Sequence, residues 1–195
     1  MATKPLNVMT QQQPLISKLY CSPYETILLV RRRPKVANGG GFAVADAGQS
    51  LIFAVDGCGI IGRKDELVLR DGDGNALLLI RHTGGIIEAL TLSRKWKGFS
   101  YESSKLVFTL REPNSCCSSK SPIRISAGSK TFEVRGDFSE GSCAIVDAAG
   151  QLIAQIGVKI SVDLYHLRIM PGIDQAFVVG VIAVLDYVNG GSTRC

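Results

Sequence analysis

An unbroken apolar run near the C-terminus constrains this chain more than any other feature of its sequence. Ala176 to Leu185 are all apolar, and the run is closed by Asp186 and preceded by Asp174 and Gln175. A membrane-spanning helix needs about 20 apolar residues, so the length of this run argues against a transmembrane segment. Its many β-branched residues favour a strand. Periodicity, however, cannot separate a buried strand from a buried helix in so short a run.

The residues around the run carry the signals of a helix. Pro171-Gly172 interrupts the chain before it, Asp174 can cap its first turn, and Gly190-Gly191 can end it. Such a helix would be apolar on every side, so the rest of the protein would have to enclose it. The residues alone leave both interpretations open, a core strand or an enclosed helix.

The remainder of the chain has the composition of a globular protein with a large core. It has 195 residues, of which 46% are hydrophobic and 20% charged, and this predicts a single domain. No apolar N-terminal segment follows a basic region, so we expect no signal peptide. The six cysteines lack paired spacing and are expected to be reduced thiols in a cytoplasmic protein.

A short pattern of strand, turn and strand recurs along the chain. It occurs as "FAVADAGQSLIFAV" (42–55), "LVLRDGDGNALLLI" (67–80) and "CAIVDAAGQLIAQI" (143–156). Asp can bond its own backbone in a tight turn and Gly supplies positive φ, so each copy predicts a β-hairpin. Further strand-like runs include 15–20 and 26–32. About a dozen short strands with polar turns indicate an all-β barrel or sandwich.

Motifs that would indicate chemistry fail when their context is considered. "GCGIIG" (57–62) matches a dinucleotide fingerprint, but a charged turn and a strand follow it where a helix is required. "DGDGN" (71–75) lacks the later ligands of a calcium loop. Cys143, His166 and Asp163 can be written as a triad, but no family signature surrounds them. We therefore expect no enzyme activity, no metal site and no cofactor.

Two basic clusters are the remaining candidates for a binding site. The first is "RRRPK" at the end of a predicted strand, and the second is "RKWKGF", in which cations alternate with aromatic residues. Cations presented at strand ends can hold lipid phosphates or a nucleic-acid backbone. The alternative is that they are solvated strand ends with Trp96 in the core. The candidate lipid-phosphate ligands are Arg31, Arg32, Arg33, Lys35, Arg94, Lys95 and Lys97.

The stretch "FEVRGDFSEGSCAIVDAAGQLIAQIGVK" resembles the plant LURP-one-related family, which belongs with the tubby C-terminal domains and the phospholipid scramblases. Supporting stretches are "GGGFAVADAGQSLIFAVDG", "ELVLRDGDGNALLLIRH" and "MPGIDQAFVVGVIAVLDYV". The resemblance covers roughly residues 15–189. It leaves residues 1–14, expected to be a disordered tail, and a C-terminal tail at 190–195.

The resemblance implies a mainly β fold, a closed antiparallel barrel of about twelve strands around a buried hydrophobic C-terminal helix. A barrel interior is the enclosure that a helix apolar on every side requires. Burial of each large side chain contributes about 1.5–3 kcal/mol. The expected core residues of the helix include Phe177, Val178, Val181, Ile182 and Leu185.

The resemblance also implies a non-enzymatic binding module, related to membrane-tethered transcription regulators and linked to plant defence. We expect it to bind anionic phospholipid headgroups, phosphoinositides in particular, through the two basic clusters. It would then be cytoplasmic and peripheral at the plasma membrane, or nuclear. The alternative is a protein–protein interaction adaptor that does not bind lipid. DNA binding is not expected, because the strongest helix candidate is predicted to be buried.

Overall fold

The computed structural model describes residues 14–34, 40–57, 65–83, 94–112 and 122–194. One 3-10 helix, η1 (Lys18–Tyr20), precedes the strands, and one α-helix, α2 (Gln175–Val188), follows them. The strands are β1 (Thr26–Arg32), β2 (Gly41–Ala45), β3 (Leu51–Asp56), β4 (Glu66–Asp71), β5 (Ala76–Thr83), β6 (Lys95–Ser100), β7 (Leu106–Arg111), β8 (Ile123–Ala127), β9 (Lys130–Asp137), β10 (Ser142–Asp147), β11 (Leu152–Ser161) and β12 (Leu164–Ile169).

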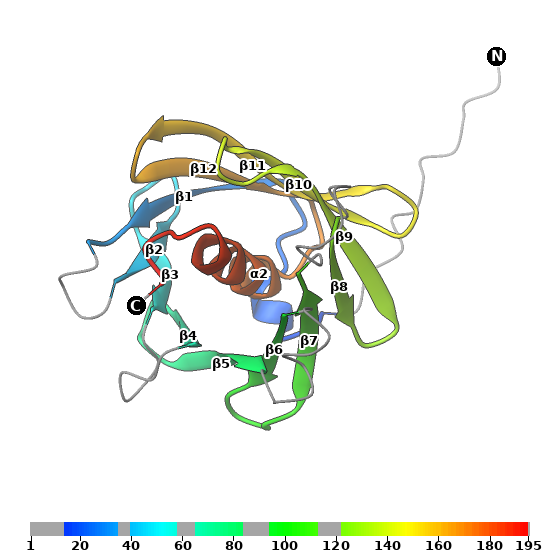
Figure 1. Cartoon of the computed structure of the whole chain (residues 1–195). Helices are drawn as coiled ribbons and strands as arrows, with labels where there is room; N and C mark the ends of the chain where they lie inside the picture. Colours follow the sequence, from blue (N-terminus) through cyan, green and yellow to red (C-terminus); the bar gives the residue numbers. More distant parts are fainter. Residues whose placement is uncertain (1–13, 35–39, 58–64, 84–93, 113–121, 195) are drawn as a thin grey trace, which may run out of the picture.

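The strands form one closed antiparallel barrel in which neighbours in sequence are neighbours in space, and β1 closes against β12. Figure 1 looks along this barrel, with α2 in its centre. Apolar side chains alternate along each strand and fill the interior, as Leu28 and Val30 do on β1. Closure leaves no exposed sheet edge among the strands of the described ranges. The mainly β barrel predicted through the family resemblance is confirmed.

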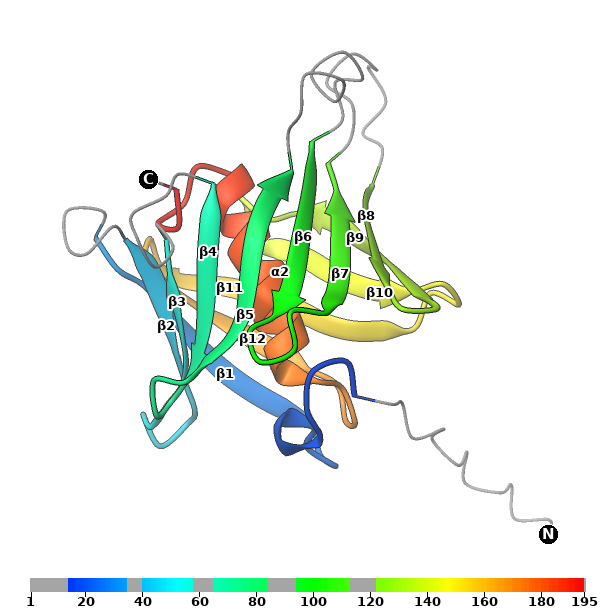
Figure 2. The same ribbon diagram turned by 90° about the horizontal axis from the view of Figure 1, so that it is seen from below.

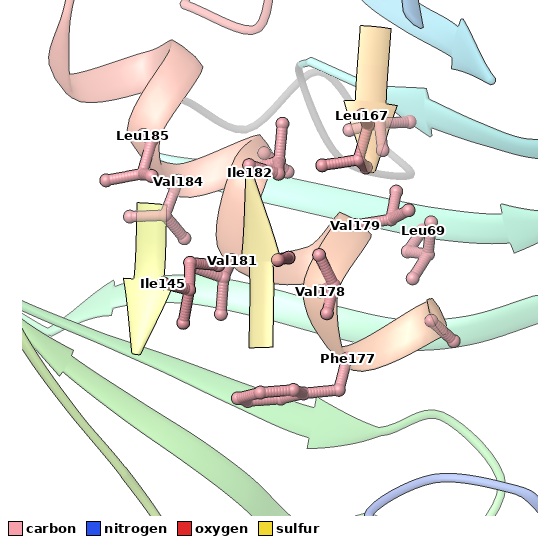
Figure 3. Close-up of a cluster of buried hydrophobic side chains, with 14 of the residues drawn as sticks. Leu69, Ile145, Leu167, Phe177, Val178, Val179, Val181, Ile182, Val184 and Leu185 are labelled. Atoms are coloured by element: carbon pink, nitrogen blue, oxygen red, sulfur yellow. The ribbon is translucent and has the colours of Figure 1, made fainter. Parts of the chain in front are cut away.

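The apolar run is the helix α2, which lies inside the barrel. Asp174 caps it by accepting a hydrogen bond from the backbone N–H of Phe177, and Gly190 follows its end with a φ of 71°. The predicted core residues Phe177, Val178, Val181, Ile182 and Leu185 are all at most 1% exposed. Figure 3 shows several of these side chains beside Leu69, Ile145 and Leu167 of the surrounding strands. The helix interpretation is therefore correct, because the closed sheet supplies the enclosure.

One glycine of the sheet allows an aromatic ring to reach the helix. A Cβ atom at Gly98 would lie 2.3 Å from Cε1 of Phe108 on the neighbouring strand β7. The space left by the missing side chain lets the Phe108 ring pack edge-on against Phe177, with 5.8 Å between the ring centroids. Contacts of this kind couple the sheet to α2.

The two flanks of the barrel contact the ends of α2, and the N-terminal flank differs from the sequence-based expectation. The stretch 15–20, read as a strand, contains the 3-10 helix η1 instead, and the backbone N–H groups of Ile16 and Ser17 donate to the carboxylate of Asp174. The short segment after α2 packs against the barrel, because Thr193 is fully buried and the Ser192 carbonyl accepts from the Gly41 N–H at 2.7 Å. These contacts tie both flanks to the ends of α2.

Candidate functional site: the basic rim of the barrel

The two ends of the barrel present different charged side chains. Three hairpin turns at the end where α2 begins are built on Asp46, Asp71 and Asp147, whose carboxylates accept hydrogen bonds from backbone N–H groups of their own turns. The end where α2 finishes carries the end of β1, the start of β6, the end of β7 and the start of β8 (Figure 2). Each of these four strand ends carries basic residues. We call this second end the basic rim. Its members include Arg31, Arg33, Arg94, Lys95, Lys97, Arg111 and Arg124.

The three consecutive arginines of the first predicted cluster have three different environments. Arg31 is exposed on the outer face of β1, and its side chain makes no hydrogen bond or ion pair with the described residues. Arg32 points into the barrel, where its Nε lies 2.8 Å from a carboxylate oxygen of Asp186. Arg33 donates from Nη2 to the Val55 carbonyl and to Asp56. The alternative that these cations are solvated strand ends does not hold for Arg32, whose side chain is 15% exposed.

Asp186, at the end of α2, holds Arg32 and the C-terminal segment together. Its side chain is completely buried. Besides Arg32 it accepts from the Thr193 N–H at 2.8 Å, the Thr193 hydroxyl at 2.9 Å and the Ser192 hydroxyl at 3.3 Å. The Arg32 guanidinium also lies 5.6 Å from the ring centroid of Tyr165. A charge held in this way stabilises the fold and is not available to a headgroup.

Arg33 belongs to a second ion-pair network, on the outer face of β3 and β4. Asp56 accepts from Arg33 at 2.9 Å and from Arg70 at 2.9 Å. Partial burial alone would raise the pKa of Asp56, but the hydrogen bonds from both arginines hold that pKa below its usual value. The carboxylate therefore stays charged, and Arg33 has a local structural partner.

The second predicted cluster lies on β6, with Trp96 directed inward. Trp96 is 1% exposed and donates from Nε1 to Glu112 at 2.9 Å, so the alternative that places it in the core is confirmed. Arg94 is exposed, while Lys95 and Lys97 are half-buried on the outer face of the strand. Lys35, the remaining member of the first cluster, lies outside the described residues.

The two predicted clusters lie at the same end of the barrel but on different sides of it. Because neighbouring strands are antiparallel, the end of β1 and the start of β6 both belong to the basic rim. Four strands, β2 to β5, separate them around the barrel in one direction. One flat surface can meet both clusters only if it approaches the rim end-on.

An apolar turn borders the exposed arginine of β1. Arg31 is paired with Leu164 across the sheet, and the turn before Leu164 exposes Val162 to 80%. Ile160, at the end of β11, is 53% exposed. Exposed apolar side chains beside a cation are the combination that interfacial binding uses, because apolar burial adds to attraction by anionic lipids.

Sequence reasoning missed two members of the rim, Arg111 and Arg124. Both are exposed on the outer face of neighbouring strands, β7 and β8, and they are Cα partners. Each alternates with buried neighbours such as Leu110 and Ile125, so its outward direction could have been predicted. Their adjacency depends on the strand register, which no local signal in the sequence reveals.

The structure separates the residues of the conceivable catalytic triad. Cys143 is buried inside the barrel, and burial raises the pKa of its thiol to about 12. His166 and Asp163 are exposed, and His166 projects from the outer face of β12. Opposite faces of the sheet cannot form a hydrogen-bonded triad. Among the described residues there is also no group of His, Cys, Asp and Glu side chains that could hold a metal ion.

The barrel leaves little room for other classes of ligand. Eleven residues of α2 are buried and occupy the interior, where a lipocalin-type barrel would hold its small molecule. The same burial removes α2 as a DNA recognition helix. With 14 residues, α2 is too short for a bilayer, and no helix in the described part of the chain is long and apolar enough to cross one.

A closed twelve-stranded antiparallel barrel around a central apolar helix, with basic side chains on one rim, defines the class of this protein. The chain belongs to the LURP-one-related family, whose model matches residues 26–186. It is 53% identical to the Arabidopsis thaliana protein LURP-one-related 6, over 93% of this chain and 98% of that protein. It is 44% identical to LURP-one-related 16 of the same plant, over 93% and 95% of the two chains.

A solved structure shows the same fold. The X-ray structure of an Arabidopsis thaliana protein covers 90% of this chain and 98% of its own, with a TM-score of 0.68 and 23% sequence identity. At that identity the likeness supports the architecture alone. The comparisons thus show the family and the fold, and the function has to be argued from the surface of the barrel.

Proposed function

We propose that this protein is a non-enzymatic module that binds anionic, phosphoinositide-bearing membrane surfaces through the basic rim of its barrel. The observation that carries the proposal is the gathering of arginines and lysines on one rim of the barrel, whereas the three aspartate turns lie on the other. A molecule polarised in this way is oriented by a negative surface before contact.

The proposal uses different residues from those that the cluster pattern would select. Arg31 is the member of the first cluster placed to meet lipid, with Val162 and Ile160 beside it to enter the interface. Arg32 and Arg33 are occupied by Asp186 and Asp56. Anionic lipids are concentrated in the cytoplasmic leaflet, which is the surface the proposal assigns to this protein.

Vesicle sedimentation with two single substitutions tests the proposal. Arg31→Ala removes a cation that faces the membrane and should weaken binding about fivefold, since such a cation contributes about 1 kcal/mol. Lys105→Ala is the matched control, because Lys105 is an exposed cation in the β6–β7 turn at the opposite end. It should bind like the wild type.

Salt provides a second arm of the same test. Binding should weaken between low salt and physiological salt, where the Debye length falls to about 8 Å. Equal weakening by Arg31→Ala and Lys105→Ala would contradict an oriented rim. Folded wild type that binds no anionic vesicle at low salt would refute the membrane proposal and favour the protein-adaptor alternative. The role in plant defence stays a prediction.

A further inference from the structure

A row of like charges crosses three neighbouring strands on the outer face of the barrel. Lys95 on β6 is the Cα partner of Arg111 on β7, and Arg111 is the Cα partner of Arg124 on β8. All three side chains leave the same face, because the residues next to them in sequence, Trp96 and Leu110 among them, are buried. Side chains directly opposite in an antiparallel pair have Cβ atoms about 4.5–5.5 Å apart. Three cations therefore share one small patch.

This arrangement is unfavourable for Arg111, the central member of the row. Like charges directly opposite across a sheet repel each other. Elsewhere on the barrel a directly opposite pair has complementary charge: Arg81 on β5 faces Glu66 on β4, with a contact of 2.7 Å. Arg111 lacks such a partner, since it stands between two cations and makes no ion pair with the described residues.

The acidic groups nearest to the row leave its centre positive. Glu133 on β9 is the Cα partner of Arg124, and its Oε1 lies 3.9 Å from Nε of Arg124. The same carboxylate is shared with Arg135, whose Nη2 lies 3.6 Å from Oε2 of Glu133. Glu112 accepts the indole N–H of the inward-facing Trp96. The Arg124 side chain is 75% exposed, so its contact with Glu133 is weak and it can turn toward a ligand.

We propose that Lys95, Arg111 and Arg124 form a binding site for clustered phosphate groups, of the kind carried by a phosphoinositide headgroup or a free inositol polyphosphate. The two neighbouring guanidinium groups match several phosphate oxygens, because each arginine can bind a phosphate through two parallel N–H donors, and Lys95 adds positive charge beside them. The inference rests on the proposed function above, and it goes further by naming the residues and the chemical group they recognise. The site lies on the part of the basic rim formed by β6, β7 and β8, and the strands β2 to β5 separate it from Arg31 on β1.

Substitution of the central residue tests this site. Arg111→Gln keeps a long polar side chain and removes the charge, and Lys105→Gln makes the same change at the opposite end of the barrel. Calorimetric titration with soluble inositol hexakisphosphate should show binding by the wild type and by Lys105→Gln. It should show binding weakened tenfold or more in Arg111→Gln, because a hydrogen-bonded charge pair is lost. Without ligand, Arg111→Gln should melt about 1–3 °C above the wild type, because repulsion in the row is relieved.

Vesicles of two compositions separate this inference from the proposed function. Vesicles of phosphatidylserine and vesicles of a phosphatidylinositol bisphosphate, matched in total charge, should both bind the wild type, the second more tightly. Arg111→Gln should lose that preference.

If Arg111→Gln keeps both the preference and the affinity for the soluble probe, the phosphate site is refuted even though vesicle binding stands. If Lys105→Gln weakens binding as much as Arg111→Gln, the attraction is non-specific and the site is refuted too. If no vesicle binds but the soluble probe binds in an Arg111-dependent manner, the membrane proposal fails and the phosphate site holds for a free ligand.

Discussion

Replacing Arg32 by alanine distinguishes a structural arginine from the lipid-binding arginine beside it. The substitution leaves the fully buried carboxylate of Asp186 with neutral donors from Thr193 and Ser192 and without its cation. Breaking a buried ion pair by removing one partner costs about 3–5 kcal/mol. Because domains are stable by only about 5–15 kcal/mol, this is a large part of the total.

Urea unfolding measures this loss directly. With a slope of about 2 kcal/mol per molar, the midpoint of Arg32→Ala should fall by about 1.5–2.5 M. Arg31→Ala, one residue away on the outer face, should stay within about 0.5 kcal/mol of the wild type. The paired replacement Arg32→Met with Asp186→Leu should recover most of the loss, since no unpaired charge is then buried. A midpoint for Arg32→Ala equal to that of Arg31→Ala would refute the structural role of the ion pair.

Four further outcomes follow from the same structure. Val181→Asp buries an unpaired charge inside the barrel and should cost several kcal/mol, so that little folded protein is recovered on expression. If the variant melts at the same temperature as the wild type, the enclosed helix is contradicted. Gly98→Ala should lower the free energy of unfolding by about 1–3 kcal/mol in urea, because the new methyl group meets the Phe108 ring. Cys143, with a pKa raised to about 12, should stay unmodified by iodoacetamide in native protein at pH 8, whereas all six cysteines should react after denaturation. The pKa of Asp56 is lower in the folded than in the unfolded protein, so its ionised carboxylate stabilises the fold above about pH 4. This stability is lost as the pH falls through the folded pKa, and urea midpoints measured between pH 6 and pH 3 should show the decline.

The hairpins of this protein and the ends of its helix can be predicted from local signals in the sequence. Each of the three hairpins carries an aspartate turn between alternating apolar residues, and the Asp46 turn forms as that pattern predicts. The cap residue Asp174 and the glycine at 190 mark the two ends of α2. Such signals are readable because turns, caps and strand alternation depend on residues only a few positions apart. The strand predicted at 15–20 is wrong, because a short apolar run has no period that separates a strand from a 3-10 helix.

The roles of the charged side chains were decided by the tertiary structure alone. Three adjacent arginines look equivalent in sequence, yet Arg32 meets an aspartate 154 positions away while Arg31 stays in solvent. Arg111 and Arg124 belong to no cluster in sequence and become neighbours through the register of β7 and β8. Closure of the barrel brings these groups together, and closure is a property of the whole chain. The sequence by itself therefore determined the hairpins and the cap signals at the two ends of the apolar run. Only the closed barrel decided that this run is an enclosed helix, which cations are buried in ion pairs and which remain exposed to a ligand.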